Sequence, residues 1–560
     1  MDEHQHVRQF CPDGYAPGRT KYVVVVGTVM SGLGKGIFAG SLARVLQDTG
    51  LSVAPIKLEG YLNMDAGTLN PTRHGEVFVL DDGVECDMDL GNYERLLGLD
   101  LCRLNFVTSG QVLASVLERE RSGGYLGSDV QVIPHVTGEI KLRLRTLAAT
   151  SGADIVFVEI GGTVGDLENG TYIEACRQLA SEERGSVFFV ALTYVPAPSA
   201  LGEQKSKPAQ LGLRQLMSLG VMPDLIVARS AKPISRTVRE KLSLYGGVAE
   251  DRVFGMHDVP STGLVPDMVR AEGIHAVVLD GLGFPAPASA RPAGGDAYAA
   301  ALRRSAAVGR TVTVGVAGKY TALRDAYASV AHALEHAAVE LGVGLRIEWI
   351  DTEKIDDGNA AALSMNGLVV PGGFGLRGVG GKLACIRHAR NSMTPFLGLC
   401  YGFQLAVIEF ARNKCGMPDA TSGEIDPESG CKPIDVLPGQ RGRMGGTMRL
   451  GGHDIALRPG TLAASLYRDA PTCRQRFRHR YELVAEYVGA LEGGGMAFSG
   501  AATDGSLTKQ ILEIPGHPFF LATQGHPELS SRPARPEPMF RGFLEAAAGA
   551  AGRRRQTQEG

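Results

Sequence analysis

The sequence lacks the features that mark secreted, metal-stapled or membrane-spanning chains. Its nine cysteines are odd in number and scattered, and no Cys-x-x-Cys pair occurs, which argues against a disulfide framework or a cysteine zinc site and indicates a reducing compartment. No run of 18 apolar residues is present, so no membrane span is predicted. The first 20 residues are polar and lack the apolar core of a secretory signal, so we expect a cytoplasmic protein.

An excess of charge of one sign is also missing. The formal net charge is −3, which gives no indication of nucleic-acid binding, although a local cluster of Lys and Arg could still bind a small nucleotide. Glycine, in contrast, is abundant, with 74 residues. This content fits an α/β protein with many tight turns from strand to helix.

Apolar strands alternate with helical patterns along the chain. In the first half we expect a helix over 36–49 and strands over 21–27, 53–58, 154–160, 187–194 and 224–228. This alternation predicts an α/β domain with a doubly wound parallel sheet, similar to P-loop folds. A second α/β pattern has strands near 311–317, 344–350, 367–370, 396–399 and 519–524.

The length of 560 residues exceeds what one hydrophobic core usually serves, so at least two domains are expected. Residues 284–297 have the Pro, Ala and Gly content of a linker. We predict a disordered extension over 1–20, a first domain over 21–283, a linker over 284–310, a second domain over 311–545 and a disordered tail over 546–560.

A glycine-rich segment, Gly27-Thr-Val-Met-Ser-Gly-Leu-Gly-Lys35-Gly36, follows the first strand. Backbone N–H groups in such a turn, together with a helix N-terminus, bind phosphate. The strict P-loop pattern is not met, because Val29 stands at its first Gly and Gly36 at its metal-binding hydroxyl. The alternative is a purely structural turn. If the loop does bind a nucleotide, carboxylates elsewhere should hold the metal, with candidates in 85–89 and 159–166.

A second strand, turn and helix surrounds Cys400. Gly398 and Gly402 lie two residues to either side and allow a sharp elbow, and the position before a helix favours a thiolate. His526 would act as base and acid, with Glu528 orienting it. The loop over 370–375 offers backbone donors for an oxyanion. An amide-splitting nucleophile and a phosphate cradle in one chain suggest that ammonia is released at one site and consumed at the other.

With these motifs the chain resembles a class I glutamine amidotransferase fused to a nucleotide-dependent amidoligase, and the first half narrows the resemblance to the CTP synthase family. The resemblance covers about residues 21–545. It rests on Ser31-Gly-Leu-Gly-Lys-Gly36, Lys57-Leu-Glu-Gly-Tyr-Leu-Asn63, His74-Gly-Glu-Val-Phe-Val79, Gln131-Val-Ile-Pro-His135, Val158-Glu-Ile-Gly-Gly-Thr-Val-Gly-Asp166, Lys205-Ser-Lys-Pro208, Gly445-Gly-Thr-Met-Arg-Leu-Gly451 and Arg478-His-Arg-Tyr-Glu482.

The resemblance implies that ATP phosphorylates O4 of UTP and that ammonia from L-glutamine then displaces the phosphate to form CTP. It implies a thioester on Cys400, Mg²⁺, feedback inhibition by CTP, activation by GTP and a homotetramer, with neither nucleic acid nor membrane as a partner. The implied ATP site comprises Gly34, Lys35, Gly36, Lys57, Arg229, Asp258 and Val259. The implied UTP/CTP site comprises Ser31, Asp166, Leu167, Glu168, Lys205, Ser206, Lys207, Gln210 and Lys241. The resemblance further implies Gly373, Gln404, Glu424 and Arg480 for glutamine, His74 and Val77 for ammonia passage, and Asp89 and Glu159 for the metal.

Several positions depart from the family pattern. Glu59 and Gly60 replace Asp and Pro beside the ATP site, and Gly124 replaces an acidic residue. In the glutaminase lid, Leu376 and Gly380 replace Tyr and Glu, which leaves activation by GTP open. Two alternatives therefore remain: a paralogous amidoligase acting on another nucleotide or pathway intermediate, and a non-catalytic scaffold that binds nucleotides.

Overall fold

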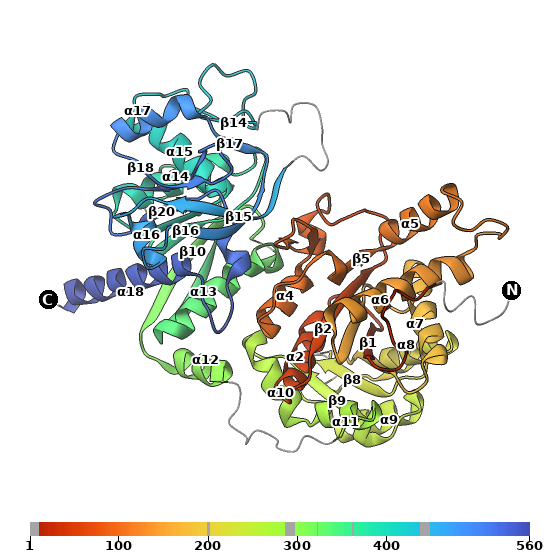
Figure 1. The fold of residues 1–560 in the computed structure, drawn as a ribbon. Coiled ribbons are helices and arrows are strands. Elements are labelled where there is room, and N and C mark those ends of the chain that lie inside the picture. Colours follow the sequence, from red (N-terminus) through yellow and green to blue (C-terminus); the bar gives the residue numbers. More distant parts are fainter. Residues whose placement is uncertain are drawn as a thin grey trace. The chain divides into compact units, whose positions relative to one another are not determined.

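The computed structural model describes residues 10–198, 202–285, 297–321, 323–360, 363–436 and 448–559. The chain divides into two compact units, which interleave in sequence (Figure 1). The first unit comprises residues 1–68 and 92–299, and the second comprises 69–91 and 300–560. The predicted boundaries did not foresee that residues 69–91 cluster with the second unit. Of the linker predicted over 284–310, residues 286–296 lie outside the described residues, and most of the described remainder forms the helix α12 (Ala297–Ala307).

The first unit is built on a seven-stranded sheet in the order β5-β2-β6-β1-β7-β8-β9, in which every pairing is parallel. Its strands are β1 (Lys21–Gly27), β2 (Val53–Glu59), β5 (Phe106–Thr108), β6 (Ile155–Ile160), β7 (Val187–Tyr194), β8 (Leu225–Ser230) and β9 (Val253–His257). Its helices are α2 (Lys35–Gln47), α5 (Ser109–Arg121), α6 (Thr137–Ser151), α7 (Gly170–Glu182), α8 (Lys207–Ser218), α9 (Arg236–Gly246), α10 (Val265–Ala271) and α11 (Ile274–Gly281).

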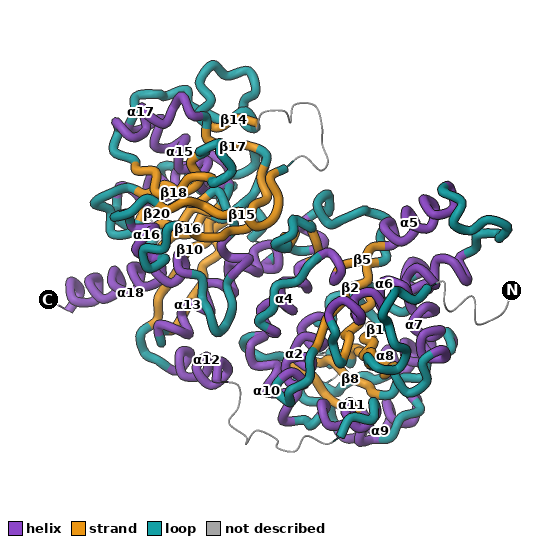
Figure 2. The backbone as a smooth tube through the Cα atoms, viewed as in Figure 1, coloured by secondary structure: helices purple, strands orange, loops and turns teal. Residues whose placement is uncertain are grey.

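Continuous apolar runs explain this sheet. Residues 23–26 of β1 and 155–158 of β6 are at most 1% exposed, as a parallel sheet covered by helices on both faces requires. The strands of the unit lie inside and the helices lie around them (Figure 2). The predicted doubly wound parallel sheet is confirmed, and the short strands β5 and β9 extend it at its two edges.

The second unit has a nine-stranded sheet in the order β11-β10-β12-β13-β20-β19-β18-β15-β16. Its pairings are parallel from β11 to β20 and antiparallel from β20 to β16. These strands are β10 (Thr311–Gly318), β11 (Gly344–Asp351), β12 (Gly367–Val370), β13 (Phe396–Leu399), β15 (Arg449–Leu457), β16 (Thr472–His479), β18 (Ala497–Ala502), β19 (Lys509–Glu513) and β20 (Phe520–Thr523). The predicted α/β domain is confirmed, and its antiparallel half was not predicted.

Shorter elements complete this unit. Two small sheets pair β3 (Val77–Val79) with β4 (Glu85–Asp87) and β14 (Ile434–Val436) with β17 (Tyr481–Leu483). The helices are α3 (Pro71–His74), α13 (Ala328–Leu341), α14 (Val379–Asn391), α15 (Tyr401–Lys414), α16 (Leu462–Leu466), α17 (Val488–Gly493) and α18 (Pro538–Glu559). The helices α4 (Met88–Leu97) and α12 (Ala297–Ala307) each cross the boundary between the units.

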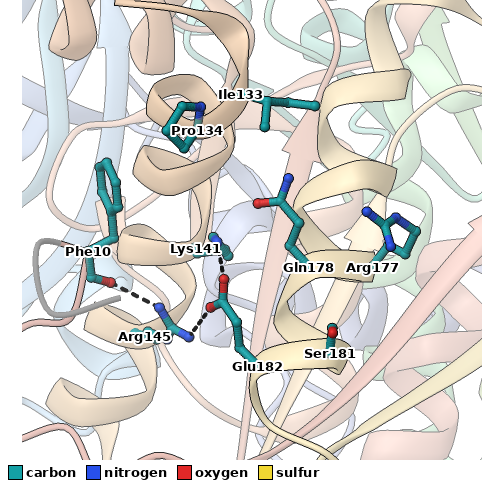
Figure 3. Close-up of a pocket in the computed structure, with 9 residues that line it drawn as sticks. All are labelled: Phe10, Ile133, Pro134, Lys141, Arg145, Arg177, Gln178, Ser181 and Glu182. Atoms are coloured by element: carbon teal, nitrogen blue, oxygen red, sulfur yellow. Dashed lines mark hydrogen bonds and ion pairs between the residues drawn. The ribbon is translucent and has the colours of Figure 1, made fainter. Parts of the chain in front are cut away.

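The end segments differ from the predicted disorder wherever the structure describes them. Phe10 is 3% exposed, and its carbonyl oxygen accepts a hydrogen bond of 3.2 Å from Arg145 of α6 (Figure 3). Tyr15 donates to Glu183 at 2.6 Å. Helix α18 continues through most of the predicted tail, and Ala547 and Ala548 are buried in the core. The buried side chains of Phe10, Ala547 and Ala548 attach these segments to the two units.

A cavity of about 280 Å³ lies where the N-terminal segment meets α6 and α7. Figure 3 shows Lys141 and Arg145 directed at Glu182, with Phe10 alongside. Arg145 lies 2.7 Å from Glu182 and 2.9 Å from Glu183. Because these opposite charges are paired with one another, we interpret the cavity as a packing space between the N-terminal segment and the two helices.

No helix within the described ranges is long and apolar enough to span a membrane.

Candidate active sites

Cys400 occupies a strained elbow between β13 and α15. Its backbone has φ 49° and ψ −97°, which is uncommon for a residue other than glycine. The Cys400 amide donates to the Thr523 carbonyl oxygen at 2.8 Å, which fixes the elbow against the end of β20. A Cβ atom on Gly402 would lie 2.1 Å from the Val370 carbonyl oxygen, and one on Gly398 would lie 2.9 Å from the Ala522 side chain. The predicted need for small residues on both sides of the nucleophile therefore has a steric cause.

His526 and Glu528 meet beside this elbow. The His526 Nδ1 atom lies 2.7 Å from Glu528 Oε1, and Glu528 is 5% exposed. Burial by itself lowers the pKa of His526, but the charges of Glu528 and Cys400 outweigh it and hold that pKa well above its usual value. The imidazolium form of His526 is therefore stabilised, as a proton carrier for amide cleavage requires.

The glycine loop after β12 closes the site. A Cβ atom on Gly372 would lie 2.8 Å from His526 Cε1 and 3.7 Å from Cys400 Cβ, so only glycine lets the backbone approach both groups. This loop lines a cavity of about 110 Å³ with Cys400 and His526. The cavity is further lined by Glu76, Val77, Tyr320, Ala326, Tyr327, Val330, Pro371, Gly373, Phe374, Arg478, Glu528 and Leu529.

Of the four residues expected to bind glutamine, Gly373 lines this cavity. The half-buried Glu424 accepts a hydrogen bond of 2.7 Å from the Gly375 amide. Burial raises the pKa of Glu424, while Arg480 counteracts this by attraction. The Gln404 Nε2 atom donates to the Tyr481 carbonyl oxygen at 2.9 Å. The four predicted residues are thus gathered around the Cys400 elbow.

Sequence reasoning missed Gln524, whose Nε2 atom donates to Cys400 Sγ at 3.6 Å. It is 1% exposed and directly follows β20, between that strand and His526, and this position could have suggested it. The thiol also lies 3.7 Å from the Arg478 carbonyl oxygen, and the Arg478 side chain pairs with Glu85 at 2.6 Å. No local sequence signal predicts that last pair, because 393 residues separate its partners.

The hairpin of β3 and β4 belongs to the second unit, which also contains Cys400. Glu76 accepts from the Ser329 amide at 3.0 Å, and Arg474 binds Asp81 through two hydrogen bonds of 3.0 and 2.7 Å. Val77, predicted to line the ammonia passage, borders the Cys400 cavity. His74 ends α3 and is exposed, and it is not among the lining residues of that cavity.

In the first unit, the phosphate-binding candidate runs from Thr28 to Gly34, between β1 and α2. Gly32 and Gly34 have φ 72° and 80°, and Val29 has φ 74°. Val29 therefore has a left-handed backbone, which glycine adopts more easily, at a cost of steric strain. Lys35 begins α2, and its ammonium donates to the Gly162 carbonyl oxygen at 2.7 Å.

Lys57 and Glu159 form a buried pair at the carboxyl ends of β2 and β6. Lys57 Nζ lies 2.6 Å from Glu159 Oε1 and 3.4 Å from Glu59 Oε1, and Tyr93 donates to Glu159 Oε2 at 2.9 Å. The two carboxylates already stabilise a cation, and their hard oxygen atoms fit Mg²⁺. Asp89, the other expected metal ligand, lies in the second compact unit. Among the described residues, no group of three or more His, Cys, Asp or Glu side chains is arranged to hold a metal ion.

Arg229 and Asp258, both expected near ATP, form an ion pair at the carboxyl ends of β8 and β9. Asp258 and Val259 directly follow β9. A Cβ atom on Gly34 would lie 4.0 Å from Met256 Cε, so β9 reaches the phosphate loop. The structure therefore brings these predicted ATP residues to the same edge of the sheet as Lys35.

The residues expected to bind the pyrimidine nucleotide lie on four segments: the phosphate loop, residues 166–168, residues 205–210 and α9. Asp166 accepts from the Thr163 amide at 2.6 Å, and Leu167 is 92% exposed with Glu168 beside it. Lys205 pairs with Glu203, and Lys241 of α9 acts electrostatically on that same carboxylate. At the start of α8, Gln210 donates to Ser206 at 2.9 Å, and Lys207 lies 6.0 Å from the centre of the Tyr245 ring. Ser31 is exposed in the phosphate loop.

The departures from the family pattern have distinct physical settings. A Cβ atom on Gly60 would lie 2.6 Å from Asn169 Oδ1, so Gly60 makes room for the buried Asn169. A Cβ atom on Gly124 would lie 2.5 Å from Arg119 Cγ. Leu376 is 60% exposed, and Gly380 has no atom within 4 Å of its Cβ position. The first two glycines are sterically required, and the lid glycine is not.

A cysteine elbow with a His–Glu pair on an α/β sheet defines a class I glutamine amidotransferase, here joined to a parallel α/β unit with a phosphate loop. A model of the CTP synthase N-terminus matches residues 21–284, and a model of class I glutamine amidotransferases matches 322–546. CTP synthase of Thermococcus kodakarensis is 47% identical over 94% of this chain and 98% of its own. CTP synthase of Rubrobacter xylanophilus is 47% identical over 95% of this chain and 96% of its own. The solved glutaminase domain of Trypanosoma brucei CTPS is 36% identical over 42% of this chain and 94% of its own, with a TM-score of 0.40. The chain belongs to the CTP synthase family.

Proposed function

We propose that this enzyme converts UTP to CTP, using ATP to activate the uracil O4 atom and glutamine as the nitrogen donor. The observation that supports glutamine as the nitrogen donor is the Cys400 elbow, with His526 held 2.7 Å from Glu528. Support for the acceptor comes from relatives named CTP synthase that match nearly the whole chain. The alternative acceptor of a paralogous amidoligase has no comparable support.

In the glutaminase reaction, the Cys400 thiolate attacks the side-chain amide carbon of glutamine. Backbone N–H groups of the loop around Gly372 and Gly373 stabilise the oxyanion. The His526 imidazolium then donates its proton to the leaving nitrogen, and Glu528 holds the ring in position for that transfer. Ammonia leaves, and water attacks the thioester on Cys400 to release glutamate. Glu424 and Arg480 bind the amino and carboxylate groups of the substrate, respectively.

In the synthetase reaction, the Thr28–Gly34 loop, Lys35 and Lys57 hold the phosphates of ATP. By membership of the family, Asp89 and Glu159 would hold Mg²⁺, and the metal would supply positive charge for phosphoryl transfer. Phosphorylation turns a poor leaving group at C4 of UTP into a good one, and ammonia displaces it. Lys205, Lys207 and Lys241 contact the triphosphate of UTP, and the segment over 166–168 contacts CTP as a feedback inhibitor.

We further infer a homotetramer, passage of ammonia along His74 and Val77, and regulation by GTP through the lid around Leu376 and Gly380. These inferences rest on membership of the family. The position of Val77 at the wall of the Cys400 cavity supports the ammonia passage.

The decisive experiment follows ATP-dependent CTP formation from UTP with either glutamine or an ammonium salt. Cys400→Ala should lose only the glutamine reaction, whereas Lys35→Ala should lose synthesis with both nitrogen sources. Release of glutamate by the wild type without CTP formation from either source would overturn the assignment of UTP as acceptor.

A further inference from the structure

Lys382 is a buried lysine behind the glutaminase site that the reaction described above does not use. It lies in the first turn of α14 and is 1% exposed. Its Nζ atom is 3.3 Å from the position a Cβ atom would take on Gly373, and 5.0 Å from the centre of the Tyr401 ring. Within the described part of the chain its ammonium makes no hydrogen bond or ion pair. Burying an ammonium group of this kind costs folding free energy, which suggests that its position has a function.

The charged and titratable groups around Lys382 show what it can act on. Burial, together with repulsion from Lys319, lowers the pKa of Lys382 to about 7. Glu424, Cys400 and Cys385 oppose this lowering by attraction. Cys385 lies on the same helix, and burial raises the pKa of its thiol to about 12, so Cys385 stays neutral near pH 7. The charges that remain to attract Lys382 are those of the nucleophile and of the expected glutamine ligand.

Gly373 and Tyr401, which lie close to the Lys382 ammonium, are both next to the predicted site. Gly373 belongs to the loop that lines the Cys400 cavity. Tyr401 directly follows the nucleophile, and its hydroxyl donates to the Gly375 carbonyl oxygen at 3.0 Å. A positive charge behind this loop and ring favours a thiolate at Cys400 and a carboxylate at Glu424.

We propose that Lys382 is a positioning residue for glutamine hydrolysis, whose buried ammonium acts from behind Gly373 and Tyr401 on Cys400 and Glu424. The inference rests on the proposed glutaminase function. It adds an electrostatic group to that site, and this group does not contact the reacting atoms.

The effect of removing Lys382 on glutamine hydrolysis should depend on pH. Below pH 7 Lys382 is charged and supports the thiolate, so its removal should slow glutamine hydrolysis most in acid. Above pH 8 Lys382 is mostly neutral in the wild type, so its removal should have little effect. A residue with only a structural role would give the same loss at every pH.

The test compares wild type with Lys382→Met, which keeps the length of the side chain and removes the charge. Glutamate release at limiting glutamine is measured from pH 5.5 to 9, together with the rate of Cys400 alkylation by iodoacetamide. We expect both rates to fall about tenfold at pH 6 and to match wild type within about twofold at pH 8.5, since tenfold corresponds to one pKa unit. Lys354→Met, at a side chain that is 81% exposed, is the matched control and should match wild type throughout.

Lys382→Arg keeps the charge at every pH and guards against a folding defect in the methionine variant. Its glutamate release relative to wild type should rise above pH 7 and stay level below it. The inference is overturned if either variant differs from wild type by a constant factor across the pH range, or does not differ at all. If wild type itself releases no glutamate from glutamine, the proposed function fails instead.

Discussion

The chain builds a site at a strand–turn–helix junction twice, and the two junctions work differently. The β1–α2 junction uses a loop of glycines from Thr28 to Gly34, and the β13–α15 junction uses Cys400 alone. Each contains a residue other than glycine with positive φ, Val29 at 74° and Cys400 at 49°. At the first junction the strained residue only shapes the backbone, whereas at the second it carries the reactive atom.

The surroundings differ in the same way. Around Cys400 the predicted catalytic partners are already joined, with the half-buried His526 bonded to the buried Glu528. Around the phosphate loop the cations are bound by groups of the protein itself: Lys35 donates to the Gly162 carbonyl oxygen, and Lys57 forms an ion pair with Glu159. A covalent reaction needs its groups assembled in advance, while a phosphate-binding site can exchange internal partners for those of the nucleotide.

The largest expected effect concerns the site around Cys400, where the partners are already joined. Glu528→Gln should lower glutamine-dependent turnover by roughly 10²- to 10⁴-fold, because the His526 ring loses the carboxylate that orients it and stabilises its charge. CTP formation from ammonium salt in the same preparation serves as the control and should stay close to wild type. Equal losses with both nitrogen sources would show that the two sites are not separable in this way.

Lys57→Met tests the predicted phosphate-binding site, where internal partners can be exchanged for those of the nucleotide. The change leaves the buried Glu159 carboxylate without its lysine, and removing one partner of a buried ion pair costs roughly 3–5 kcal/mol in the free energy of unfolding. CTP formation should fall with both nitrogen sources. The double variant Lys57→Met/Glu159→Gln should recover stability without activity, as measured by denaturant unfolding and CTP assay. A double variant as unstable as the single one would contradict the pairing.

Val29→Gly separates backbone strain from chemistry. Glycine adopts the left-handed conformation freely, so relief of strain should stabilise the protein by about 1 kcal/mol. Ammonia-dependent CTP formation should stay within about twofold of wild type. The matched variant Cys400→Gly relieves strain at the other junction and should abolish the glutamine reaction. Loss of synthesis in Val29→Gly would mean that the valine side chain itself takes part in the nucleotide site.

The smallest effect concerns the glutaminase lid. Gly380 is the second residue of α14 and has open space around its Cβ position, so Gly380→Glu should stabilise the protein by about 1 kcal/mol through helix propensity and the helix dipole. If the lid governs regulation, this variant should also respond more strongly to GTP in glutamine-dependent assays than Gly380→Ala does. Equal responses of the two variants would remove the lid charge as a determinant.

Much of the fold followed from local patterns. The buried strands of both parallel sheets were predicted because a short, unbroken apolar run between glycine-rich turns is typical of a strand that is covered on both faces. The antiparallel strands β15, β16, β18 and β19 were missed, since strands with one mixed face give a weaker signal. The contribution of residues 69–91 to the second unit was also missed, because Asp81 and Arg474 meet only after folding.

The sequence by itself determined which family the chain resembles, and from it Cys400, His526 and Glu528 are predicted to be a nucleophile, its proton carrier and the group that orients the carrier, with the Lys35 loop predicted to bind phosphate. Only the tertiary structure decided how those groups are tuned. The pairing of Lys57 with Glu159, the contact of Gln524 with Cys400 and the burial of Lys382 behind Gly373 join segments far apart in the chain. Burial and neighbouring charge set the protonation of such groups, and neither can be read from local sequence.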